Sequence, residues 1–196
     1  DSSGSAVEAF IGYLGLEDCI FRDNESPHDG GALVVDDSFN GSAGITRCIF
    51  DHNSASGQGG AIFNRSIINI TDSTFANNHA GTNGGAIASG IYRVGLRVNN
   101  STFSGNTADN GGAIAAGSLQ LIHSTISGNE AATAGGGIFS TSTIPNPELG
   151  LNLVNSIIAG NSANSDPDVS GPVDGQSGVN LIGGNPKLAP LAGYGG

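Results

Sequence analysis

The chain has 196 residues, and 6 Lys and Arg stand against 17 Asp and Glu, which gives a formal net charge of −11. A surface of this sign repels phosphate backbones and anionic headgroups, so composition argues against nucleic acid as a partner. No apolar run approaches the ~20 residues that span a bilayer, so we expect no direct membrane insertion.

One sequence unit recurs six times along the chain. Each copy has an apolar anchor residue followed three positions later by Asn, and a glycine pair follows this Asn in the first five copies, for example in "NGGAI" at 110–114. The anchors are Phe21, Phe50, Phe75, Phe103, Ile126 and Ile158. Small units that repeat in this way are typical of solenoids, in which each unit buries its apolar face only by stacking on its neighbours.

Three short strands are predicted in each unit, at residues 14–16, 19–21 and 30–33 of the first copy. The positions seven and five before each anchor are apolar in every copy, and the positions between them are mostly polar or Gly, which indicates a strand with one buried face. No helical periodicity occurs, and the units are too short for a βαβ crossover. The sequence therefore predicts an all-β fold, a right-handed single-stranded parallel β-helix of about six coils with three short strands each.

Residues 1–165 are predicted to form the coils, and residues 166–196 an irregular C-terminal segment or cap of the same domain. The first copy begins in the middle of a coil without a visible cap. Because solenoids need capped ends, we expect further sequence upstream of Asp1 in the native protein.

Stacking places equivalent residues of successive coils above one another, so the recurring Asn is expected to form an internal ladder that satisfies the corner backbone. Its members would be Asn24, Asn53, Asn78, Asn106, Asn129 and Asn161. Cys19 and Cys48 occupy equivalent inward positions of adjacent coils, about one strand spacing apart. Either a disulfide or two reduced core thiols fits this placement.

The F-x-x-N and G-G-A-I phrases resemble the repeats of chlamydial polymorphic outer-membrane proteins. The chain also resembles bacterial secreted β-helix proteins with a choice-of-anchor Q region, through "PDVSG" at 167–171, "NLIG" at 180–183 and "NPKLAPLAGYGG" at 185–196. It departs from that second pattern at Asn185 and Tyr194, where Asp and Asn are usual. Both resemblances imply an extracellular or cell-surface location, and neither brings catalytic residues to this chain.

A calcium site is one local hypothesis. Asp166, Asp168 and Ser170 stand at the first, third and fifth positions of a calcium-loop pattern, and Asp174 stands at the ninth. Ser177 replaces the bidentate Glu of that pattern, so a tight turn that ends the solenoid is the competing interpretation. We expect no other cofactor.

Ligand contacts are expected in the variable loops that follow the third strand. Tyr92, Arg93 and Phe139 are the candidate contact residues, because exposed aromatic side chains hold sugars and partner loops well; packing under their own loops is the other interpretation.

The sequence favours a non-enzymatic extracellular module, structural or adhesive, such as a stalk or filament subunit. Its partners would be other copies of itself, head to tail or lateral, or a surface receptor or glycan. A polysaccharide-binding or polysaccharide-degrading β-helix, a lyase or glycosidase, is the alternative. Such enzymes need a pair of carboxylates or a base with clustered cations, and the charged residues of this chain are scattered.

Overall fold

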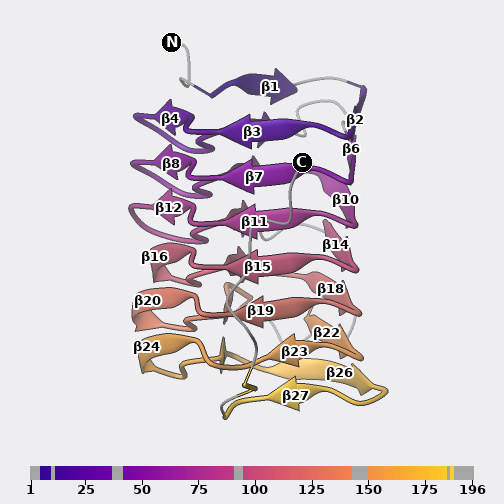
Figure 1. The fold of residues 1–196 in the computed structure, drawn as a ribbon, viewed down its shortest axis with the longest axis vertical. Coiled ribbons are helices and arrows are strands. Elements are labelled where there is room, and N and C mark those ends of the chain that lie inside the picture. The colour runs from indigo at the N-terminus through magenta and orange to yellow at the C-terminus, as the bar shows by residue number, and fades with distance from the viewer. Residues whose placement is uncertain are drawn as a thin grey trace.

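The computed structural model describes residues 5–9, 12–36, 42–90, 95–142, 150–184, 186 and 187. These residues form a parallel β-solenoid of about six coils, stacked along the long axis from β1 to β27 (Figure 1). The all-β prediction is confirmed, but each coil contains four strands and not three. None of the described residues forms a helix long and apolar enough to cross a membrane.

Four sheets run along the solenoid, which we call A to D. Sheet A contains β1 (Val7–Ala9), β5 (Leu33–Val35), β9 (Ile62–Asn64), β13 (Ile87–Ser89), β17 (Ile114–Ala116), β21 (Ile138–Ser140) and β25 (Val169–Ser170). Sheet B contains β2 (Tyr13–Glu17), β6 (Ser42–Thr46), β10 (Ile67–Thr71), β14 (Leu96–Asn99), β18 (Leu119–Ile122), β22 (Leu151–Val154) and β26 (Val173–Ser177). Sheet C contains β3 (Ile20–Arg22), β7 (Ile49–Asp51), β11 (Thr74–Ala76), β15 (Thr102–Ser104), β19 (Thr125–Ser127), β23 (Ile157–Ile158) and β27 (Leu181–Ile182). Sheet D contains β4 (Glu25–Ser26), β8 (Ser54–Ala55), β12 (His79–Ala80), β16 (Thr107–Asn110), β20 (Glu130–Ala134) and β24 (Ser162–Ser165).

Left-handed residues turn the chain from one sheet to the next. Between sheets B and C the corner residue has φ of 53° at Asp72 and 45° at Asn100, and between sheets C and D it has φ of 55° at Asn77. Asn and Asp tolerate this region better than most residues.

The glycine pair forms the corner between sheets D and A, and its two members have different roles. Gly84 has φ of +68°, a region that other residues enter only with strain. Gly85 lies against the next coil, where a Cβ atom would be 2.1 Å from the carbonyl oxygen of Gly112. The first glycine is therefore needed for its conformation and the second for close backbone approach.

The core is a continuous apolar column inside the four sheets. The anchors Phe21, Phe50, Phe75 and Phe103 stack with ring centroids 4.7 to 4.9 Å apart and nearly parallel planes. Phe50, Phe75 and Phe103 are fully buried. Each of these Phe residues lies on a successive strand of sheet C. The rings are therefore separated by the distance between hydrogen-bonded strands, which brings them into stacking contact.

The sheets continue past residue 165. Strand β25 pairs with β21 in sheet A, β26 pairs with β22 in sheet B, and β27 pairs with β23 in sheet C. This part of the segment 166–196 therefore adds a further set of strands to the stack.

Candidate functional site

The predicted asparagine ladder runs through the corner between sheets C and D. Each Asn Nδ2 donates to Oδ1 of the Asn in the next coil, at 2.7 to 2.9 Å, from Asn24 through to Asn161. Each Oδ1 also accepts from the backbone N–H of the preceding Asn, at 2.9 to 3.2 Å. From Asn53 onward, Nδ2 donates in addition to the carbonyl of the anchor one coil earlier. The ladder thus pairs buried polar groups of the corner with one another, which is a structural role.

Asp168 ends this ladder. Its Oδ1 accepts from the backbone N–H of Asn161 at 3.1 Å and from Asn161 Nδ2 at 2.9 Å, in the place of another Asn. A carboxylate only accepts hydrogen bonds. Unlike an Asn side chain, Asp168 therefore has no N–H groups that would need an acceptor in a further coil, and it can end the series.

Of the predicted calcium residues, Asp166 and Asp168 lie between β24 and β25, Ser170 lies in β25, and Asp174 lies in β26. Ser170 Oγ donates to Asp166 Oδ2 at 3.1 Å, and one oxygen of Asp168 is engaged by the ladder. The side chain of Asp174 lies outside the described side chains. Among the described residues no group of three or more His, Cys, Asp or Glu is arranged to hold a metal ion. Calcium binding by Asp166, Asp168, Ser170 and Asp174 stays a prediction.

A second ladder of hydroxyl groups lies two residues before the anchor. The backbone N–H of Ser73 donates to Ser101 Oγ at 3.1 Å, and each Ser Oγ donates to the carbonyl two residues before it. The series ends at Asn180, whose Oδ1 accepts from the backbone N–H of Ser156 at 2.9 Å. Both ladders therefore end on a side chain of the segment after residue 165.

Cys19 and Cys48 continue the hydroxyl ladder toward the N-terminus as free thiols. The Sγ atom of Cys19 lies 3.2 Å from the carbonyl oxygen of Glu17, and that of Cys48 lies 3.3 Å from the carbonyl oxygen of Thr46. In each case the carbonyl belongs to the residue two positions earlier, as it does for the serine hydroxyls. Burial raises the pKa of the Cys48 thiol and keeps it in the unreactive protonated form. Of the two states that the sequence leaves open, the structure contains the reduced one.

We expect Cys48→Ser to change the free energy of unfolding by less than about 1 kcal/mol, because the new hydroxyl takes the geometry of Ser73 and Ser101. Urea denaturation checks this. A loss of several kcal/mol, or a mass that shifts on reduction of the wild-type chain, would contradict the free-thiol ladder.

Charged corner residues pair between coils on the surface. Arg47 binds Asp18 through Nε at 2.7 Å and also contacts Glu17, and Arg22 Nε lies 3.1 Å from Asp51. The hydrogen bonds from Arg47 lower the pKa of Asp18. Ion pairs near the surface such as these add little stability each.

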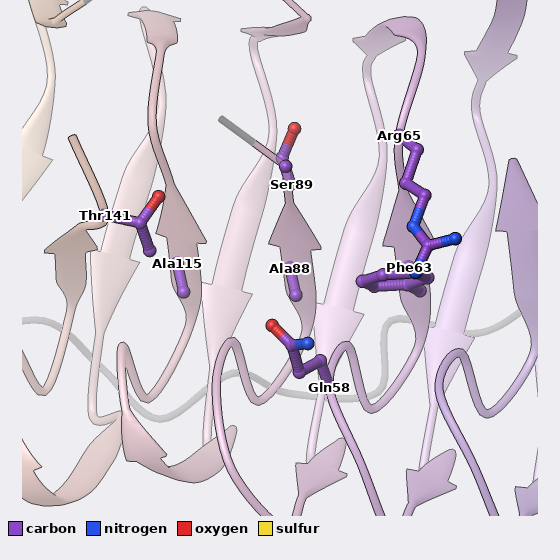
Figure 2. A pocket seen from close by; sticks show the side chains of 8 residues that line it. Gln58, Phe63, Arg65, Ala88, Ser89, Ala115 and Thr141 are labelled. Atoms are coloured by element: carbon purple, nitrogen blue, oxygen red, sulfur yellow. The ribbon is translucent and has the colours of Figure 1, made fainter. Parts of the chain in front are cut away.

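The outer face of sheet A carries a groove. It has a volume of about 510 Å³ and is lined by Gln58, Phe63, Arg65, Ala88, Ser89, Gly90, Ala115 and Thr141. Figure 2 shows Ala88 and Ala115 side by side at its base, with Phe63 and Arg65 at one end and Thr141 at the other. Sequence reasoning did not single out these lining residues.

Of the three predicted ligand-contact residues, only Phe139 belongs to the described part of the chain, and it lies beside this groove. Phe139 pairs in register with Ala115, so it is the next residue of the same outward column, and it is half-buried. Tyr92 and Arg93 lie outside the described residues. The structure therefore places one of the three predicted contacts beside the groove.

The family model that matches is that of the Chlamydia polymorphic membrane protein repeat, at residues 47–65, 72–90, 100–117 and 123–141. Each match begins at the left-handed corner after sheet B and ends just past a strand of sheet A. No curated protein and no solved structure matches the chain. The similarity to the choice-of-anchor Q region stays a prediction. Four stretches of the chain are therefore similar to the Chlamydia polymorphic membrane protein repeat, and they stack as successive coils of a parallel β-solenoid.

Proposed function

We propose that the chain is a non-enzymatic extracellular or cell-surface module with a structural or adhesive role, within a stalk or filament. The asparagine ladder is the observation that carries this proposal. The Asn side chains that recur along the coils hydrogen-bond one another parallel to the solenoid axis. They therefore stabilise the stacked coils, which supports a structural role over a catalytic one. Similarity to a polymorphic membrane protein repeat supports the surface location.

The proposed partners are other copies of the chain, or a receptor or glycan of a neighbouring surface. Lateral association is supported by apolar side chains on the outside of the first coils. Ile20 and Ile49 pair in register on sheet C with 61% and 36% of their surface exposed, and Tyr13 on sheet B is 74% exposed. Neighbouring exposed apolar side chains of this kind commonly mark contact surfaces.

Beads coated with the purified chain test the proposal. We expect them to attach to cultured cells or to cluster with one another, while albumin-coated beads do neither. The same preparation is incubated with a panel of polysaccharides, and we expect no new reducing ends. Beads that neither attach nor cluster would contradict the adhesive role, and reducing ends that accumulate with the purified chain would show an enzyme.

A further inference from the structure

A column of apolar and β-branched side chains runs along the outer face of sheet C. Its members are in register on successive strands, which Figure 1 shows one above another from β3 to β27: Ile20, Ile49, Thr74, Thr102, Thr125, Ile157 and Leu181. Ile20, Ile49 and Leu181 are 61%, 36% and 46% exposed, and the other four are partly exposed. None of these seven residues is charged. The column is therefore an exposed, largely apolar strip along the solenoid, roughly 29 Å long at about 4.8 Å for each strand spacing.

The chain turns back toward this column after its last strand. Strand β27 is the terminal strand of sheet C. A Cβ atom placed on Gly160, in the coil before β27, would lie 3.3 Å from Pro186 Cδ and 3.3 Å from Ser127 Oγ. Pro186 therefore lies against coils that precede β27, on the outside of the corner next to sheet C.

Residues 188–196, which lie outside the described residues, have the length and the composition to cover the column. Their sequence, LAPLAGYGG, contains no charged residue. In the polyproline II conformation, which Pro186 and Pro190 favour, these nine residues span roughly 28 Å at about 3.1 Å each. The strand spacings from Ile157 to Ile20 add up to roughly 24 Å. The segment is thus long enough to reach from Pro186 to the first strand of sheet C.

The spacing of the larger side chains in this segment matches the spacing of the column. Leu188, Leu191 and Tyr194 recur at every third residue. Because polyproline II has about three residues per turn, these side chains lie on one face, roughly 9 Å apart. Two strand spacings are roughly 9.6 Å, so the three side chains meet every second strand of sheet C. Polyproline II leaves its backbone groups to solvent, which suits a segment that crosses strands on the outside of a sheet.

We propose that residues 188–196 pack along the outer column of sheet C as a strap. The strap runs from the C-terminal coils toward the N-terminal coils, and Tyr194 covers Ile20 and Ile49. This segment is favoured over a separate molecule because its attachment at Pro186 holds it at high effective concentration beside the column. The packing is intramolecular and does not depend on an adhesive role. Copies that associate laterally through Ile20 and Ile49 would first have to displace the strap.

NMR of the full chain with labelled isoleucine δ1 methyl groups tests the strap. We expect nuclear Overhauser effects between the Tyr194 ring and the methyl groups of Ile20 and Ile49, with intensities that do not depend on protein concentration. Tyr194→Ser should abolish these effects and shift both methyl signals. Ile67 is the internal control, because it is 41% exposed on the outer face of sheet B and its signal should not move.

Proteolysis gives a second measurement on the same chain. Lys187 is the only lysine, so lysyl endopeptidase cuts the chain once, where the strap begins. A protease cleaves a segment that has opened locally, so Leu191→Ser, which loosens the strap, is expected to speed this cleavage about tenfold. Val179→Ser is the matched control, because it removes an apolar side chain that is already 87% exposed, and it should leave the rate unchanged.

Four outcomes would overturn the proposal. These are the absence of Overhauser effects from Tyr194 to Ile20 and Ile49, effects to Ile67 instead, a cleavage rate that Leu191→Ser does not change, and effects that fade on dilution. The last of them would show that the segment of a second copy fills the column.

Discussion

Asn106→Leu is expected to lower the free energy of unfolding by about 3–5 kcal/mol. In the folded chain Asn106 Oδ1 accepts from the backbone N–H and Nδ2 of Asn78, at 3.0 and 2.9 Å, and Asn106 Nδ2 donates to Phe75 O at 3.0 Å and to Asn129 Oδ1 at 2.8 Å. A leucine leaves these groups buried without their partners, at about 1–3 kcal/mol for each group that finds no other. Urea denaturation followed by circular dichroism measures the loss.

Asn152→Leu is the matched control for this substitution. Asn152 lies on the outer face of β22 and is exposed, so the same change there should cost less than about 0.5 kcal/mol. If the two substitutions cost the same, the asparagine ladder does not hold the coils together.

Gly85→Ala is the second substitution for which we expect a large effect, a loss of about 3 kcal/mol or more. The added Cβ would lie 2.1 Å from Gly112 O and 2.6 Å from the backbone N and O of Thr107. These are backbone atoms of the next coil, so relief requires that the two coils separate. Thermal denaturation of the variant measures the effect.

Gly90→Ala separates this steric effect from a general cost of replacing glycine. A Cβ at Gly90 meets no atom closer than 3.7 Å, and the residue does not have a positive φ. We expect its melting temperature to stay within a few degrees of the wild-type value. Equal losses at Gly85 and Gly90 would rule out coil contact as the cause.

Much of the coil could be predicted from sequence because stacking makes each column visible as a repeated letter. The Asn recurs three residues after every anchor, and the glycine pair follows this Asn by five or six residues in the first five copies. Sheet D was missed because its strands are as short as the two residues of β8 and β12. A signal for it exists five residues after the anchor, where only Ser or Ala occurs, as at Ala55, Ala80 and Ala108. Small side chains at a constant offset mark a buried column even where alternation is too short to detect.

The ends of the ladders could not be predicted in the same way. Asp168 occurs once and matches a calcium-loop pattern, and only its position in space makes it the acceptor for Asn161. The groove was missed for a related reason. Ala88 and Ala115 look like core residues of a strand, and the step that they form depends on the larger Phe63 in the coil before them and Phe139 in the coil after.

Hydrogen exchange of the asparagine side-chain amides, followed by NMR, tests most directly whether the recurring asparagines form the interior of a rod. The Nδ2 protons of Asn53, Asn78, Asn106 and Asn129 should exchange far more slowly than those of the exposed Asn152, because both of their protons are bonded in a buried corner. Exchange as fast as at Asn152 would mean that these amides face solvent, where they would be free to bind a ligand, and would contradict the ladder.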